Sequence, residues 1–168
     1  MKKVLLVIDM QNDFVTGALK NPDAEAIVDG IVKRIESFDG EIIATRDTHE
    51  ETYLSSTEGK YLPVTHCVKN TWGWEIVPEI ANALAKRNAR IIDKPTFGYK
   101  DWNVLQGVDE VEMLGTCTDI CVVSNALIIK AQHPDLDLRV RKDLCAGTTK
   151  ANHDSALAVM ACCQVKIV

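Results

Sequence analysis

The chain has 168 residues, about the length of one domain, and 46% of them are hydrophobic and 26% charged, as in folded globular proteins. Its formal net charge of −5, without a basic stripe, argues against a nucleic-acid partner. The apolar run that starts at Val4 is too short for a signal peptide or a membrane span, so we expect one cytoplasmic domain over residues 1–168 without a membrane partner.

Apolar runs alternate with amphipathic stretches along the chain. Continuous apolar runs predict buried strands, and apolar spacings of three and four predict helices. In chain order we predict a strand at Val4–Ile8, a helix over about Asp23–Ser37, a strand at Glu41–Thr45, a long polar loop over residues 46–73, a helix over about Glu75–Arg87, strands at Ala89–Ile92 and Val111–Gly115, a helix over about Asp119–Ala131, a strand at Leu138–Val140, a helix over about Lys150–Cys162 and a strand at Val165–Val168. Loops as long as the one predicted here are more often functional than not.

This alternation predicts right-handed β-α-β units and a three-layer α/β/α fold, with a mostly parallel central sheet of about six strands. In such sheets, ligands bind beyond the carboxyl ends of the strands. Polar or reactive residues follow the first four strands: Asp9, then Asp47 and His49, then Lys94, and finally Cys121. The sequence therefore predicts a site at this edge of the sheet.

Cys121 is the candidate nucleophile among six cysteines, which in a reducing compartment are expected to be free thiols. It should lie in the first turn of a helix, with Thr118 or Asp119 near the N-cap. A helix N-terminus lowers the pKa of a thiol, and backbone N–H groups there can hold an oxyanion. The alternative is a buried cysteine that only packs, and local context does not separate the two.

Asp9 and Lys94 are the candidate partners of the nucleophile. A carboxylate at the end of the first strand can act as a general acid and base, although a turn aspartate is the simpler alternative. A cation at Lys94 would stabilise a thiolate and orient Asp9, although taken alone it reads as an exposed lysine. Pro95 keeps Lys94 extended and out of a helix.

Asp47, His49 and His66 form a candidate cluster of carboxylate and imidazole groups. Asp and His two positions apart on an extended segment can reach one ion, and imidazole is a common ligand of transition metals. Such short motifs are frequent, however, and solvated histidines in a polar loop are the alternative.

Three segments together resemble the isochorismatase-like cysteine hydrolase superfamily: VIDMQNDF at residues 7–14, KPTFG at 94–98 and GTCTDICV at 115–122. They occur in the family's order, and the resemblance covers essentially the whole chain. It implies a catalytic triad of Asp9, Lys94 and Cys121. It also implies a cis peptide between Thr116 and Cys117, with the N–H groups of Cys117 and Cys121 facing the oxyanion.

Position 117 departs from the family pattern, in which a small residue such as Ala is usual. The cysteine found here raises the possibility of an inactivating disulfide between Cys117 and Cys121.

The segments RDTH at 46–49 and PVTHC at 63–67 resemble the nicotinamidase/pyrazinamidase branch of the superfamily. This resemblance implies one divalent ion (Zn, Fe or Mn) bound by Asp47, His49 and His66, with Glu58 as a further ligand. The ion would hold the ring nitrogen of a heteroaromatic substrate and orient its carbonyl.

The same branch usually places the substrate ring between two aromatic side chains. Phe14 fits the first position, but no Trp or Phe precedes His66. Leu62, Trp72 or Tyr99 are the candidates to replace it. The chain is also compact for the family, which implies a shorter lid and a more open site.

The resulting hypothesis is a cysteine amidohydrolase that releases ammonia from a small amide, nicotinamide first, through a thioester. The first alternative is another C–N hydrolase of the superfamily, acting on a carbamoyl, ureido or maleamate-type substrate. The second is a non-catalytic pseudoenzyme or interaction module, and the third is a redox or metal-storage role. The resemblance further implies a small-molecule amide as partner and a homo-oligomer.

Overall fold

A single parallel sheet runs through the chain, which the computed structural model describes over residues 1–168. Its strands follow the order β3-β2-β1-β4-β5-β6, and every neighbouring pair is parallel. The strands are β1 (Lys3–Ile8), β2 (Glu41–Asp47), β3 (Arg90–Lys94), β4 (Glu110–Thr116), β5 (Asp137–Ala146) and β6 (Lys166–Ile167). The predicted α/β fold and strand number are confirmed.

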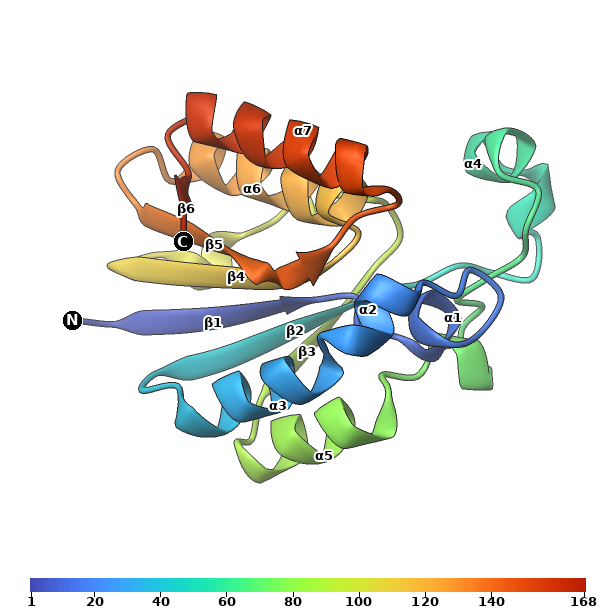
Figure 1. The fold of residues 1–168 in the computed structure, drawn as a ribbon, viewed down its shortest axis with the longest axis horizontal. Helices are drawn as coiled ribbons and strands as arrows, with labels where there is room; N and C mark the ends of the chain where they lie inside the picture. The colour runs from blue at the N-terminus through green and yellow to red at the C-terminus, as the bar shows by residue number, and fades with distance from the viewer.

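Helices cover both faces of the sheet. They are α1 (Asn12–Val15), α2 (Pro22–Ala26), α3 (Val28–Ser37), α4 (Thr57–Tyr61), α5 (Pro78–Lys86), α6 (Val123–Gln132) and α7 (Lys150–Cys162). Figure 1 shows α3 and α5 on one face and α6 and α7 on the other, while α4 projects beyond the carboxyl ends of the strands. None of these helices has the length and apolar character needed to cross a membrane.

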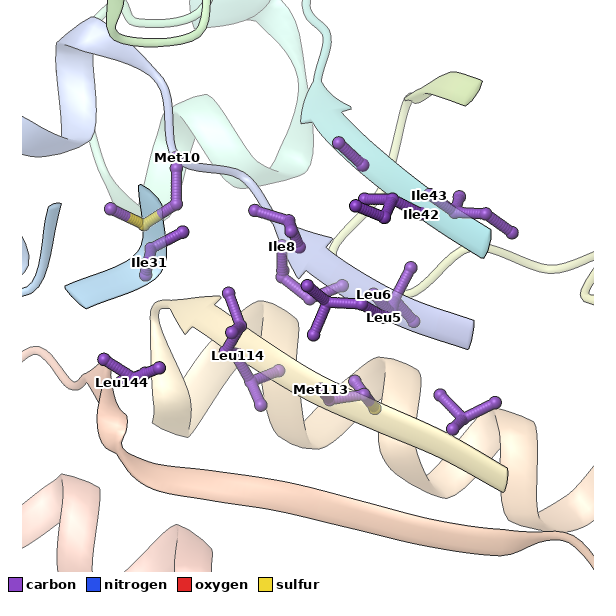
Figure 2. Packing of buried hydrophobic residues seen from close by; sticks show 14 of the residues in the cluster. Leu5, Leu6, Ile8, Met10, Ile31, Ile42, Ile43, Met113, Leu114 and Leu144 are labelled. Atoms are coloured by element: carbon purple, nitrogen blue, oxygen red, sulfur yellow. The ribbon is translucent and has the colours of Figure 1, made fainter. Parts of the chain in front are cut away.

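The core is built around β1, which lies between β2 and β4. Leu6 is fully buried and pairs with Ile43 on one side and Met113 on the other. Figure 2 shows side chains of β1, β2 and β4 gathered in this region, with Met10 beside Ile31 of α3. Each such buried side chain contributes roughly 1.5–3 kcal/mol relative to leaving it in water. This packing fixes the carboxyl ends of the central strands.

Three predicted helices have different bounds in the structure. The helix predicted from Asp119 begins only at Val123, after a π-helical turn. The stretch 23–37 is divided into α2 and α3, with Ile27 between them. The helix predicted from Glu75 begins at Pro78, because proline suits the first turn of a helix but not its interior. A single 3₁₀ turn at Trp72–Trp74 lies before the predicted start of this helix.

The predicted loop over residues 46–73 contains short helical turns rather than only irregular chain. A 3₁₀ turn at Tyr53–Ser55 leads into α4, and the Ser56 hydroxyl accepts a hydrogen bond from the Gly59 N–H at 2.9 Å. These elements are too short to show a periodic apolar pattern, so sequence periodicity cannot reveal them.

Candidate active site

Asp9, Lys94 and Cys121 lie together at the carboxyl edge of the sheet. The Lys94 ammonium is 2.6 Å from Asp9 Oδ2 and donates a hydrogen bond to Cys121 Sγ at 3.5 Å. Asp9 and Lys94 are completely buried, and Cys121 is 4% exposed. Lys94 is therefore not the exposed lysine that its type alone suggests. The three side chains come from the ends of β1 and β3 and from the turn after β4.

The Asp9 carboxylate is held in one orientation by β2. Its Oδ1 accepts a hydrogen bond from the Thr45 hydroxyl at 2.6 Å, and its own N–H donates to the same hydroxyl oxygen. The backbone of Asp9 has a φ of 48°, which L-residues rarely adopt and which is common at functional sites. Burial raises the pKa of Asp9, and the nearby Lys94 charge lowers it. The charge of Asp47 raises the pKa further, and the net shift is upward.

Cys121 lies in a π-helical turn, Thr118–Val122, that leads into α6. The cap residue is Cys117, so Thr118 and Asp119 are the first two residues of the turn, next to the cap as expected. The predicted lowering of the thiol pKa, by contrast, is wrong. Burial and the Asp9 carboxylate raise the pKa of Cys121, and Lys94 offsets this only in part.

The strand before this turn ends in an unusual backbone. The Thr116–Cys117 peptide bond is cis, as the family resemblance implies. Gly115 has a φ of 122°, and a Cβ added there would lie 2.1 Å from the Ile8 carbonyl oxygen. Glycine is thus required at this position, where β4 lies against Ile8 of β1. All six cysteines are free, including Cys117 and Cys121.

Further residues, missed by sequence reasoning, hold the nucleophile turn from outside. The Asp119 carboxylate accepts hydrogen bonds from the Thr148 N–H and hydroxyl. The Thr118 hydroxyl is hydrogen bonded to His153 Nδ1 at 2.8 Å. Asn125 donates to the Cys121 carbonyl oxygen at 2.8 Å.

Asp47, His49, Glu58 and His66 form one compact cluster, in which one ligand atom from each lies within 4.8 Å of all the others. His49 Nε2 is 2.9 Å from Asp47 Oδ2, and His66 Nε2 is 3.6 Å from the same oxygen. The other oxygen, Asp47 Oδ1, is buried and accepts no hydrogen bond. This oxygen lies 3.5 Å from the Lys94 ammonium instead. The two imidazoles and two carboxylates of the cluster form a donor set that fits a divalent metal ion.

The surroundings of the cluster orient its ligands. His66 Nδ1 donates to the Val64 carbonyl oxygen at 2.7 Å, which leaves Nε2 to face the carboxylates. The Gln11 side chain is fully buried, accepts from the Asp47 N–H at 2.7 Å and donates to the Asp47 carbonyl oxygen at 2.8 Å. Tyr53 packs edge-on against both histidine rings.

One cavity of about 480 Å³ is bordered both by Cys121 of the triad and by three members of the cluster. It is lined by Phe14, Leu19, Asp47, Thr57, Glu58, Tyr61, Leu62, His66, Phe97, Cys117, Ile120, Cys121 and Thr148. Acidic, imidazole and thiol groups therefore face a space that is otherwise mainly apolar.

A family model described as "Isochorismatase domain" matches residues 3–168. The chain belongs to the isochorismatase family. It is similar to a nicotinamidase/pyrazinamidase of Mycobacterium tuberculosis, with 28% identity over 99% of this chain and 98% of the relative. It is also similar to a nicotinamidase of Escherichia coli, with 28% identity over 94% of this chain and 89% of the relative. The solved pyrazinamidase of Pyrococcus horikoshii in complex with zinc is 30% identical over 100% of this chain and 99% of its own, with a TM-score of 0.83.

Within this isochorismatase-family site, Phe14 and Leu62 line the cavity, as the sequence suggests, but Trp72 and Tyr99 do not. Trp72 is 62% exposed, and Tyr99 packs edge-on against the buried Trp102. Phe97 lines the cavity instead. Phe97 stands three residues after Lys94 in the KPTFG segment, and this position is the sequence signal that indicates a place near the site.

Proposed function

We propose that this isochorismatase-family chain is a cysteine amidohydrolase that converts nicotinamide to nicotinate and ammonia. The observation that carries the proposal is the Lys94 ammonium, buried between Asp9 and Cys121 beside a cluster suited to a metal ion. A cysteine, a carboxylate and a cation in contact form an activated nucleophile. We infer the substrate from the similarity to the nicotinamidase and nicotinamidase/pyrazinamidase relatives.

In the first half-reaction, Cys121 Sγ attacks the amide carbonyl carbon while its proton passes to Asp9. The raised pKa of Cys121 means that the resting thiol keeps its proton, so a base in contact with it is needed. The N–H groups of Cys117 and Cys121 hold the oxyanion. When the tetrahedral intermediate collapses, the C–N bond breaks and Asp9 gives the proton to the departing ammonia.

In the second half-reaction, water hydrolyses the thioester. Asp9, again a carboxylate, removes a proton from water as its oxygen attacks the thioester carbon. The C–S bond then breaks, and Asp9 returns its proton to the Cys121 thiolate. The product is released as nicotinic acid, which loses its carboxyl proton to solvent and becomes nicotinate. Lys94 keeps a positive charge beside Asp9 and Cys121 throughout both halves.

Asp47, His49, His66 and Glu58 would hold the divalent ion. The bound ion would supply a contact for the ring nitrogen of the substrate, which orients the amide carbonyl toward Cys121. This donor set suits Zn, Fe or Mn. The aromatic walls of the ring site are Phe14, whose ring centroid is 5.6 Å from that of His66, and Phe97. The cytoplasmic location and the homo-oligomer stay predictions.

The test is product analysis with chelator-treated protein and with protein reloaded with Zn, Fe or Mn. We expect nicotinamide to give nicotinate and ammonia in equal amounts, and we expect protein reloaded with a metal to form more of both than chelator-treated protein. Pyrazinamide and carbamoyl, ureido and maleamate-type compounds form the comparison panel. Ammonia from one of the last three but not from nicotinamide would favour the alternative C–N hydrolase. No release from any amide by metal-loaded, reduced protein would contradict the proposal.

A further inference from the structure

The cavity extends well beyond the catalytic groups. At its inner end, Cys121, His66 and Asp47 are 4%, 3% and 1% exposed. Toward solvent, the lining changes to Leu19, Tyr61, Leu62, Phe97 and Ile120, which we call the outer compartment. Tyr61, Leu62 and Phe97 are 90%, 39% and 41% exposed, so they surround the opening.

The outer compartment is built from four separate segments. Leu19 follows α1, Tyr61 and Leu62 end α4, Phe97 follows β3, and Ile120 belongs to the nucleophile turn. Figure 1 shows α4 standing away from the body of the molecule, at the same edge of the sheet. Apolar side chains from unrelated segments that converge on one opening are costly to keep in water and mark a ligand-contact surface.

The outer compartment carries no charged side chain. Tyr61 brings one hydroxyl, and its polar neighbours in the cavity lining are the hydroxyls of Thr57 and Thr148 and the thiols of Cys117 and Cys121. The remaining polar groups of the lining, on Asp47, Glu58 and His66, belong to the metal cluster. A charged substituent on the substrate would find no counter-charge here. The chemistry of the compartment fits an uncharged apolar group.

The size of the cavity also exceeds what the simple substrate needs. A volume of 480 Å³ lies within the range of about 300–1,000 Å³ that holds drug-sized ligands. Nicotinamide is a single six-membered ring with one carboxamide group. With its carbonyl at Cys121 and its ring beside Phe14 and His66, it would leave the outer compartment unfilled.

We propose that the enzyme also hydrolyses heteroaromatic carboxamides that carry an apolar alkyl or aryl substituent on the ring, with the substituent bound in the outer compartment. The inference rests on the proposed function and names a wider substrate class for the same site. The reaction is the same hydrolysis, in which water and the amide give the ring carboxylate and ammonia.

The test compares kcat/KM for nicotinamide with that for nicotinamides bearing a methyl, propyl or phenyl group on the ring. The measured quantity is the ratio of kcat/KM for the substituted amide to kcat/KM for nicotinamide. In the wild type we expect this ratio to rise by up to about fourfold for each methylene group that becomes buried. Leu19→Asp and Leu62→Asp should lower this ratio at least tenfold for the propyl compound. Both substrates are measured on one preparation, so any loss of folded enzyme cancels in the ratio.

Leu54→Asp is the matched control. Leu54 is 54% exposed, lies in the same stretch as α4 and does not line the cavity, so this variant should keep the wild-type ratio. Rejection of the substituted amides by an enzyme that hydrolyses nicotinamide would overturn the inference alone. An unchanged ratio in both Leu19→Asp and Leu62→Asp would do the same. Failure with every amide would overturn the proposed function, and the inference with it.

Discussion

The Lys94 ammonium contacts three acidic groups, Asp9, Asp47 and Cys121. It lies 2.6 Å from Asp9 and 3.5 Å from both Asp47 and Cys121 Sγ, and none of it is exposed to water. Burial lowers the pKa of Lys94, but Asp9, Cys121 and Asp47 outweigh it and raise the pKa above its usual value. Lys94 thus stays charged and compensates two buried carboxylates.

Replacing Lys94 with Met should therefore affect both stability and activity. The variant leaves Asp9 and Asp47 without their buried counter-ion, which we expect to cost about 3–5 kcal/mol of unfolding free energy. Hydrolysis should fall to background. Urea unfolding and nicotinate release measure the two effects. Lys100→Met changes an exposed lysine nearby and should shift stability by less than about 0.5 kcal/mol; equal effects in the two variants would refute this role for Lys94.

Gln11 is expected to set the affinity of the metal site, because its side chain fixes both backbone groups of Asp47. Gln11→Ala should weaken binding of a divalent ion by about 10–100-fold, as is typical when an outer partner of a ligand is lost. Competition with a chromophoric chelator measures this on the folded protein. Gln106→Ala, at an exposed position, is the control. Unaltered affinity in Gln11→Ala would show that Asp47 needs no such support.

At the scale of elements, β4 lies against β1 at Gly115, shortly before the nucleophile turn begins. Gly115→Ala would place a methyl group 2.1 Å from the Ile8 carbonyl oxygen and should destabilise the protein by more than about 3 kcal/mol. Gly107 also has a positive φ, of 74°, but nothing lies within 4 Å of its added Cβ. Gly107→Ala should therefore cost only about 1 kcal/mol. Urea midpoints that coincide for the two variants would rule out the steric explanation.

A pH-dependent contribution should come from the edge of the sheet, where Asp137 of β5 lies 3.0 Å from Lys166 of β6. The hydrogen bond from Arg139, with help from Lys166, lowers the pKa of Asp137 from 3.8 to about 2. A lowered folded-state pKa stabilises the protein above the unfolded pKa, and this contribution is lost as pH falls from about 4 toward 2. Because Asp137 and its partners Arg139 and Lys166 are all partly exposed, solvent screens the interaction, and we expect at most about 1 kcal/mol.

Asp137→Asn should therefore be less stable than the wild type near neutral pH, with a gap that narrows below about pH 4. Urea unfolding across this range measures the gap. Asp135→Asn, an exposed aspartate in the preceding loop, is the control and should show no such gap. A gap that stays constant or widens in acid would contradict the assigned pKa shift.

Sequence patterns predict the elements that repeat over several residues and miss those shaped by single contacts. The apolar run of β1 and the polar residues after β1 to β4 were enough to bring Asp9, Lys94 and Cys121 to one edge. The division at Ile27 and the turn at Thr118–Val122 were missed, because both depend on local backbone geometry. His153 was missed because it reaches the nucleophile turn from α7, which is distant in sequence. Phe97 was missed because its place in the KPTFG segment does not by itself show that its ring lines the cavity.

At the scale of the whole molecule, the sheet draws on residues from 3 to 167, and the candidate site takes its groups from almost the same span. The catalytic groups are anchored at the ends of buried strands, whereas the outer compartment is carried by turns and by α4. This division predicts a rigid chemical centre with a more variable entrance. We expect the chain to unfold in one cooperative transition, as the sequence-based prediction of a single domain requires.

The central claim is that Cys121 forms a thioester with the substrate. Intact-mass measurement of acid-quenched, metal-loaded enzyme during turnover of nicotinamide tests it most directly. We expect the wild type and Cys117→Ala to gain the mass of a nicotinoyl group, and peptide mapping to place this group on Cys121. A folded Cys121→Ala variant should form no adduct and release no ammonia. Ammonia release by Cys121→Ala at a rate near that of the wild type would contradict the account.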